Sequence, residues 1–339
     1  MTQNGLFAYG TPLWGNLARS YDVTYDISAP YASVNIEAND KLNFEGGLRW
    51  DIGKAYGNYC GGSSSQVDMN NDGIIQPTEQ KVYSINFANP SLVNYHYNYV
   101  SYSIGSNYKL TANTAVFARY STGYSAKADR ILFTTSVLAD GSAKGVTDKL
   151  EQFELGYKSN MKNLGLFITG FYANVNEAGG YEATTQKIIE AHYKSYGIVL
   201  EFAARVSKEF EVHGGATFTK AEITEGSSKG NLPRRQSPLI YNLMPTYTTG
   251  NLSIGISAIG TSYSYSQDDN LLKFKGYILV NPFVNYKFNK DISLSVNGNN
   301  IFNTLGITES EEDAIPSNSI VRARSVTGRT ISATLGVNF

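Results

Sequence analysis

Apolar and polar side chains alternate along most of the chain, and this period of two limits the fold more than any other feature. In the last segment Ile331, Ala333, Leu335 and Val337 share one parity, while Thr, Ser, Gly and Asn occupy the other. Successive side chains of a β-strand point to opposite faces, so such a segment forms a strand with one apolar and one polar face. Because the pattern recurs from residue 42 onwards, the sequence predicts an all-β, antiparallel protein.

The polar face carries few charges. Only 17% of the residues are charged, and the polar positions of the alternating segments are mostly Ser, Thr, Asn and Gly. A soluble sandwich would expose that face to bulk water and would tolerate many more Lys and Glu residues. The pattern therefore predicts a transmembrane β-barrel, with the apolar face against outer-membrane lipid and the polar face around a lumen. No run of about 18 apolar residues predicts a transmembrane helix.

The connections between the expected strands alternate between short and long. Turns of two to four residues, such as 39–40 and 160–163, alternate with the connections 53–94, 124–149, 176–189, 222–239, 264–273 and 299–327. Outer-membrane barrels have this asymmetry because their periplasmic turns are short and their extracellular loops are long. About thirteen strands are expected, near 24–38, 41–52, 95–110, 114–123, 150–159, 164–175, 190–206, 210–221, 240–247, 252–263, 274–288, 291–298 and 328–339.

The composition excludes several classes of function. Lys and Arg total 28 against 29 Asp and Glu, so no excess of positive charge is available for nucleic acid. Three scattered histidines and the single Cys60 form no catalytic or metal motif, so we expect neither an enzyme nor an organic cofactor. The first residues lack the basic and apolar regions of a signal peptide, which leaves a cytosolic chain or a piece of a longer exported protein.

One segment matches the calcium loop of EF-hands without a gap. In that pattern the side chains at positions 1, 3 and 5 wrap the ion, glycine at position 6 permits a sharp turn, and a carboxylate at position 12 closes the shell. The segment lies in the connection 57–94, which we expect to be a long extracellular loop. Its alternative is a polar turn in solvent, because the flanks do not form paired helices. The expected Ca²⁺ ligands in 68–79 are Asp68, Asn70, Asp72, the Ile74 carbonyl, Gln76 and Glu79.

Five motifs, in order, resemble the C-terminal barrel of TonB-dependent outer-membrane receptors. The stretches 276–288 and 292–303 are similar to the family's "GYTLVNL…YKF…LSLNVNNLFN" pattern, and 328–339 resembles its closing strand. The resemblance covers nearly the whole chain from about residue 21. The other matching stretches are 31–50, 117–124 and 153–158.

The resemblance implies energised uptake of a scarce ligand across the outer membrane of a Gram-negative bacterium. It further implies a plug domain, a TonB box and a barrel of about 22 strands, whereas residues 1–339 provide about thirteen strands and no counterpart of the plug. We therefore expect the C-terminal portion of such a receptor, with the TonB complex reached through the missing N-terminal region. A ferric siderophore is the first expected ligand and a carbohydrate the second. The alternatives are a passive porin or adhesin-like barrel, and a soluble all-β calcium-dependent binding domain.

Two further features carry weaker predictions. The adjacent Arg234 and Arg235 are expected to clamp a small anionic ligand, because guanidinium groups pair bidentately with carboxylate or phosphate. Their alternative is neutralisation by local acids, while a solvated loop is expected for the acidic run 309–313. The terminal Phe339 ends an alternating strand and resembles the signal recognised by the barrel-assembly machinery, with a strand ending in Phe by chance as its alternative.

Overall fold

The protein is described by a computed structural model of the 339-residue chain. The structure describes residues 7–8, 11–12, 19–66, 68, 70–80, 82–85, 87–126, 147–182, 187–310 and 320–338. Within these residues the fold is built from strands, apart from one short 3-10 helix, η1 (Pro77–Glu79). No helix among the described residues is long and apolar enough to cross a membrane.

A single antiparallel sheet contains most of the described chain. Thirteen strands follow each other along one hydrogen-bonded path, in agreement with the number expected from the alternation, and two more strands pair with β5 beside that path. The path runs in chain order through β3 (Arg19–Ser28), β5 (Leu42–Ser65), β7 (Ser91–Lys109), β8 (Thr114–Ala126), β9 (Thr147–Met161), β10 (Leu164–Glu182), β11 (Lys187–Arg205), β12 (Phe210–Ile223), β13 (Leu239–Thr249), β14 (Leu252–Thr261), β17 (Tyr277–Lys287), β18 (Ile292–Asn299) and β21 (Thr330–Val337); β4 (Tyr31–Glu37) and β6 (Val82–Ile85) are the side strands.

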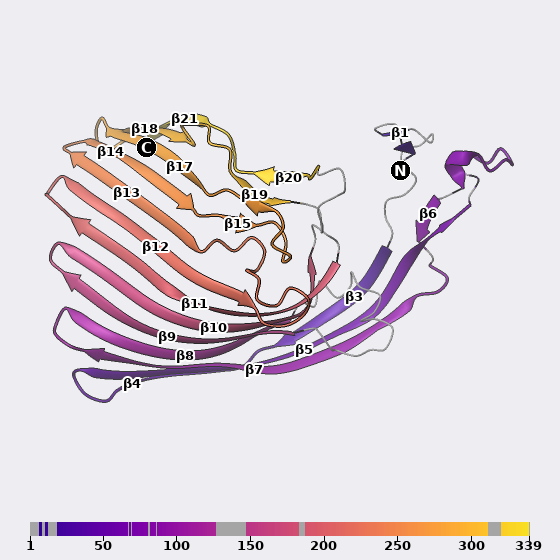
Figure 1. The fold of residues 1–339 in the computed structure, drawn as a ribbon, viewed down its shortest axis with the longest axis horizontal. Helices are drawn as coiled ribbons and strands as arrows, with labels where there is room; N and C mark the ends of the chain where they lie inside the picture. Colours follow the sequence, from indigo (N-terminus) through magenta and orange to yellow (C-terminus); the bar gives the residue numbers. More distant parts are fainter. Residues whose placement is uncertain are drawn as a thin grey trace.

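The sheet curls into an open trough (Figure 1). The edge strands β3 and β21 do not pair with each other among the described residues, so the barrel is not closed. Short turns join the strands at one end of the trough, and the longer connections lie at the other end. The longer connections carry the small sheets β15 (Ser264–Tyr265) with β16 (Lys273–Phe274) and β19 (Ile307–Ser310) with β20 (Ala323–Ser325), whereas β1 (Phe7–Ala8) pairs with β2 (Thr11–Pro12) near the N-terminus.

Two boundaries differ from those expected. The connection expected over 57–94 is shorter, because β5 continues to Ser65 and β7 begins at Ser91, so this hairpin extends well beyond the others at the loop end. The strand expected at 24–38 is divided into β3 and β4 by Ala29 and Pro30. Proline lacks the N–H that a continuous ladder requires, but the Pro30 carbonyl still accepts a hydrogen bond from the Trp50 N–H at 2.9 Å.

The convex face of the trough carries the apolar parity of the strands. Leu155, Ile198 and Leu335 are 58%, 53% and 63% exposed, as expected for side chains that contact lipid rather than a protein core. Neither Leu294 nor Phe202, which share this parity on β18 and β11, is buried. The apolar side of the alternation therefore lies on the outside of the molecule, as the sequence predicted.

The concave face carries charged side chains of β5 and β8. Glu45 forms an ion pair with Arg119, and Arg49 pairs with Asp51 at 2.8 Å. Apolar side chains are present on this face too: Phe167 and Ile240 belong to the concave parity of β10 and β13 and are 46% and 49% exposed. The lumen wall thus carries exposed apolar side chains as well as charged ones. It is less uniformly polar than the sequence predicted.

Candidate functional site at the loop end of the trough

The candidate ligand site lies on the concave side of the trough, where three connections meet. These are the connections 224–238, 262–276 and 300–329, of which residues 311–319 fall outside the described chain. The first begins with a tight turn, in which the Gly230 N–H donates to the Ile223 carbonyl at 2.9 Å. Gly226 and Gly230 have φ angles of 81° and 90°, which residues with a Cβ rarely adopt. This turn directs the following Arg-Arg segment towards the neighbouring connection.

Arg234 is bound to Asp268 through both its backbone and its side chain. The Arg234 N–H donates to Asp268 Oδ1 at 2.8 Å, and Nη1 lies 3.1 Å from Oδ2. The two side chains are 16% and 23% exposed, so the pair is largely removed from solvent. A partly buried, charge-assisted pair of this kind fixes geometry more strongly than an exposed one. Arg234 therefore holds the connection 224–238 onto the connection 262–276.

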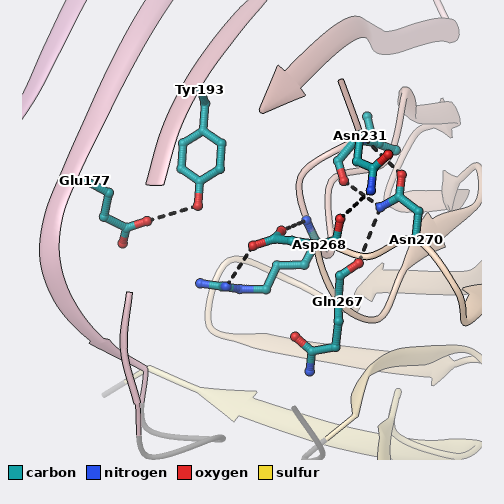
Figure 2. Close-up of polar contacts among 8 residues, drawn as sticks. Glu177, Tyr193, Asn231, Gln267, Asp268 and Asn270 are labelled. Atoms are coloured by element: carbon teal, nitrogen blue, oxygen red, sulfur yellow. Dashed lines mark hydrogen bonds and ion pairs between the residues drawn. The ribbon is translucent and has the colours of Figure 1, made fainter. Parts of the chain in front are cut away.

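Two asparagines strengthen the same junction (Figure 2). Asn270 accepts a hydrogen bond from the Leu232 N–H at 2.9 Å and donates to the Leu232 carbonyl at 2.8 Å. Asn231 donates to the Asp268 carbonyl at 2.9 Å. Each amide thus satisfies backbone groups of the neighbouring connection, and the two segments form one continuous surface.

Arg235 connects this surface to the third connection. Its N–H donates to the Tyr265 carbonyl at 2.7 Å, and its Nη1 lies 3.1 Å from Glu309 Oε2. Arg324 Nη1 lies 3.0 Å from the other carboxylate oxygen of Glu309. The Arg324 side chain is 62% exposed, whereas Glu309 is 18% exposed. One carboxylate therefore joins two arginines, and the outer one presents its guanidinium group to solvent.

The strand wall beside these connections contributes a further polar pair. The Tyr193 hydroxyl of β11 donates to Glu177 of β10 at 3.2 Å, on the concave side (Figure 2). In the connections themselves, the three guanidinium groups of Arg234, Arg235 and Arg324 face the two carboxylates of Asp268 and Glu309. Such a surface attracts anionic ligands and offers hydrogen-bond donors to carboxylate, phosphate or phenolate oxygens.

Arg234 and Arg235 are thus paired with local acids, which is the alternative that the sequence analysis gave for them. Their role in ligand binding stays a prediction. Sequence reasoning missed Asp268, Asn270 and Arg324. Asp268 lies 34 positions from Arg234, Asn270 lies 38 positions from Leu232, and Arg324 joins the site through Glu309. No local pattern marks such long-range pairs. Glu309 is paired rather than solvated, and the other acidic residues of its run, together with Phe339, lie outside the described residues.

The segment 68–79 folds around its acidic side chains. Asp68 accepts hydrogen bonds from the N–H groups of Gly73 at 2.7 Å and Asp72 at 3.2 Å. Gly73 has a φ of 84°, the conformation that the sharp turn of the calcium-loop pattern needs. The Glu79 carboxylate is 2% exposed and accepts a bond from the Gln76 N–H at 3.0 Å.

Asp72 is the centre of this segment. Its carboxylate accepts hydrogen bonds from the Ile74 N–H at 2.8 Å, from Asn70 at 2.9 Å and from Gln76 at 3.1 Å. These donors, the Ile74 N–H first, lower the pKa of Asp72 below its usual range, since they stabilise the ionised form. Across the described residues, no three acidic, His or Cys side chains converge on one point. Ca²⁺ binding at 68–79 stays a prediction.

Comparison with known proteins decides the family. The family described as "TonB dependent receptor-like, beta-barrel" matches residues 2–301, which is most of the chain. The chain belongs to the TonB-dependent receptors. This family consists of receptors and transporters of the Gram-negative outer membrane.

Curated relatives support the same family. An "Uncharacterized TonB-dependent receptor" of Haemophilus influenzae is 24% identical over 221 residues, covering 60% of this chain and 62% of the relative. The "Probable TonB-dependent siderophore receptor PiuA" of Acinetobacter baumannii is 21% identical over 314 residues, covering 83% of this chain and 37% of the relative. The chain thus spans less than two thirds of the length of each curated relative.

Solved structures show the same fold. The ferric yersiniabactin uptake receptor FyuA of Yersinia pestis superposes with a TM-score of 0.73 at 17% identity, covering 95% of this chain and 47% of that one. The siderophore receptor PiuA of Acinetobacter baumannii gives a TM-score of 0.69 at 20% identity, covering 94% of this chain and 44% of that one. At this identity the likeness establishes the receptor barrel fold alone.

Proposed function

We propose that this chain is the C-terminal barrel portion of a receptor for energised uptake of a ferric siderophore. The observation that carries the proposal is the surface formed by Arg234, Arg235 and Arg324, which gathers three guanidinium groups around two carboxylates at the loop end of the trough. Many ferric siderophores are anionic chelates with exposed oxygen atoms, and guanidinium groups pair well with such oxygens. The names of the similar receptors FyuA and PiuA point to the same ligand class.

The rival functions make different predictions about ligand and energy. A carbohydrate receptor would bind a neutral sugar and would gain little from the arginine surface. A passive porin would let solutes through without the TonB complex. The family assignment speaks against the soluble calcium-dependent domain, because the apolar parity lies on an exposed convex face rather than in a core.

The test uses the receptor that carries this chain, expressed in a host without its own siderophore receptors. We expect uptake of radiolabelled ferric siderophores to require TonB. We expect an excess of neutral oligosaccharide to leave the uptake rate unchanged. Uptake that continues in a host without TonB would contradict the proposal in favour of a passive pore. Saturable binding of oligosaccharides but of no ferric siderophore would favour the carbohydrate receptor.

A variant ties the ligand to the arginine surface. Arg324→Gln removes the exposed charge, and we expect siderophore affinity to fall about tenfold, which corresponds to ~1.4 kcal/mol. Arg205→Gln is the matched control, since Arg205 is an exposed arginine at the short-turn end of β11. Equal affinities of the two variants would show that the arginine surface does not contact the ligand.

We further propose that the segment 68–79 binds Ca²⁺ as an extracellular loop. Its support is the donor set: carboxylate and amide oxygens of Asp68, Asn70, Asp72, Gln76 and Glu79, with the Ile74 carbonyl, are the hard ligands that Ca²⁺ prefers. Asp68 and Gly73 already hold the turn that this loop pattern requires. The ion would link the two ends of the segment and make it more rigid.

Protease resistance tests the calcium proposal. We expect a chelator to accelerate cleavage of the segment between β5 and β7, and Asp68→Ala to abolish the difference between calcium and chelator. Asp269→Ala is the matched control, because Asp269 caps a turn in another connection, where its Oδ1 accepts from the Leu271 N–H at 3.0 Å. Identical cleavage of the unaltered receptor with and without chelator would defeat the proposal.

Two partners follow from the family. We propose that the TonB complex acts on this receptor through a region N-terminal to the barrel, and that the barrel-assembly machinery recognises the C-terminal segment that includes Phe339. Support for the second comes from β21, which lies at an edge of the sheet. Removal of Phe339 is expected to lower the yield of folded barrel in the outer membrane, and an unchanged yield would contradict this role.

A further inference from the structure

A hollow of about 560 Å³ lies in the wall of the trough, across β4, β5, β7 and β8. Two neighbouring rows of residues, paired across these strands, form its floor. Both rows carry the concave parity of β5, so the hollow opens towards the lumen. The rows are Ser33–Gly47–Ser103–Ser121 and Arg49–Ser101.

Small side chains leave this space open. At Gly156, which has the concave parity of β9, the Phe117 ring occupies the place that a Cβ would take. A Cβ at Gly47 would instead meet Ser103 Oγ at 3.5 Å, which is an ordinary contact, and one at Gly123 would meet no other part of the described chain within 4 Å. The glycines of the hollow are therefore uncovered, and its volume is available to a ligand.

The floor of the hollow is polar and carries a balanced charge. Four serine hydroxyls line it, and each donates and accepts hydrogen bonds. Arg49 is the one charged residue of the lining, and Asp51 neutralises it, since the Arg49 Nε and Nη2 groups donate to the carboxylate at 2.9 and 2.8 Å. Such a surface offers a solute several hydrogen bonds without a strong electrostatic attraction, and a passage requires binding weak enough for the solute to leave.

An ion pair bounds the hollow on its short-turn side. The Glu45 side chain extends over Gly105 to Arg119 in the next concave row. The two side chains are 50% and 45% exposed, and ion pairs with this exposure are weak. The Arg119 guanidinium group can therefore leave Glu45 and bond to the oxygen atoms of an anionic ligand. The pair marks the lower end of the hollow without closing it.

We propose that the ferric siderophore passes through this hollow along the barrel wall, and that Gly47, Ser103 and Ser121 limit the size of the chelate that passes. This inference rests on the proposed function. The hollow has the volume of a small-molecule site, for which ~300–1,000 Å³ is typical, and its hydroxyls match the oxygen atoms on the surface of such a chelate. Its strands β5, β7 and β8 lie across the trough from β14, β17 and β18, so it is separate from the arginine surface (Figure 1).

The first test fills the hollow in the receptor that carries this chain. Ser103→Trp places an indole ring on the floor. We expect TonB-dependent uptake of the ferric siderophore to fall at least about tenfold, which corresponds to ~1.4 kcal/mol in the barrier to passage. Binding of the chelate at the cell surface should be unchanged, because the arginine surface lies elsewhere. Ser103→Ala keeps the space open and should leave uptake unchanged.

A matched control separates passage from folding. Ser257→Trp adds the same ring at another partly buried serine of the concave parity, on β14 and outside the hollow, and should transport like the unaltered receptor. Each variant is accepted only if it retains the heat-modifiable mobility of a folded barrel in gel electrophoresis.

The second test traps the chelate in transit and does not require a bulky substitution. With Cys60 replaced by serine, Ser103→Cys provides one thiol in the hollow. A ferric siderophore that carries a short thiol-reactive group should be captured there in cells that have TonB, and not in cells without it. Ser257→Cys is the matched control, and we expect capture at this position to be at least about tenfold lower.

The outcomes separate this inference from the proposed function. Absence of TonB-dependent siderophore uptake by the unaltered receptor would refute the proposed function, and the inference with it. Normal uptake by that receptor, combined with equal uptake by the two tryptophan variants or equal capture at the two thiols, would overturn the passage and leave the transport function in place. A loss of uptake in Ser103→Ala as large as in Ser103→Trp would overturn the role of size.

Discussion

Leu200 on β11 offers the sharpest test of where the membrane lies. It is four residues from Tyr196, in the direction of the short turns. Tyr196 pairs with Tyr172 on the apolar face, and because aromatic residues gather at membrane–water interfaces, we take Tyr196 as the outer boundary. A strand rises ~3.3 Å per residue and is tilted by roughly 45° in such barrels, so Leu200 lies about 9 Å below the boundary. The apolar band of an outer-membrane barrel is about 25 Å tall, which places Leu200 close to its middle.

Leu200→Arg therefore places a charge in the hydrocarbon. An arginine at the midplane of such a barrel costs about 2–4 kcal/mol of folding free energy. The adjacent Val199 is the matched control, because it lies on the concave parity and pairs with Thr169 and Thr217. Val199→Arg is expected to cost less than about 1 kcal/mol, since its guanidinium group reaches the aqueous lumen.

The assay is reversible denaturant unfolding of the receptor in lipid vesicles, followed by tryptophan fluorescence. We expect the free energy of unfolding of Leu200→Arg to fall at least ~2 kcal/mol below that of Val199→Arg. Equal losses, or a larger loss for Val199→Arg, would refute the assignment of the two faces.

Three further predictions concern the connections. Hydrogen bonds lower the pKa of Asp72, so their stabilisation is complete above the usual carboxyl pKa and is lost only as the pH falls below that usual value; hydrogen exchange over 70–79 should then become faster. Unchanged exchange after correction for intrinsic rates would contradict this. Asn300→Ala should lower the free energy of local opening by about 1–3 kcal/mol, because the side-chain amide of Asn300, which is 3% exposed, bonds to the backbone of Thr304 and Thr327. Hydrogen exchange around both threonines should become faster, and protection equal to that of the parent receptor would refute this. Glu309→Gln removes the carboxylate between two arginines, so proteolysis after residue 310 should accelerate; an unchanged cleavage rate would show that the pairs do not hold the connection.

The strands were predictable because their physics is local. Alternation along 292–296 or 331–337 needs only the period of a strand, and the structure places the apolar members of both segments on the same face. The thirteen strands of the path follow from the same rule. The extent of β5 beyond residue 52 was not predictable, because its outer half pairs with β7 above the expected membrane boundary, where the alternation no longer marks lipid contact.

The candidate sites depended on information that the sequence does not display. The proximity of Arg234 to Asp268 is set by how two connections pack, and neither segment carries a periodic signal. The pair of Arg119 with Glu45 needs the register of β5, β7 and β8, since a shift of one residue would move Arg119 to the other face. By contrast, the positive φ of Gly73 follows from residue spacing alone, because both the calcium loop and the polar turn that was its alternative place a glycine there, and Ca²⁺ binding at 68–79 stays a prediction.

An accessibility scan along β11 tests the central claim most directly. With Cys60 replaced by serine, single cysteines from 196 to 204 would carry a nitroxide spin label in the membrane-inserted receptor, and collision with oxygen or with a water-soluble nickel complex would be measured. Even positions, including Ile198, Leu200 and Phe202, should favour oxygen, and odd positions should favour nickel, with a period of two. A scan without alternation, or with the odd positions in contact with lipid, would contradict an outer-membrane barrel with this wall.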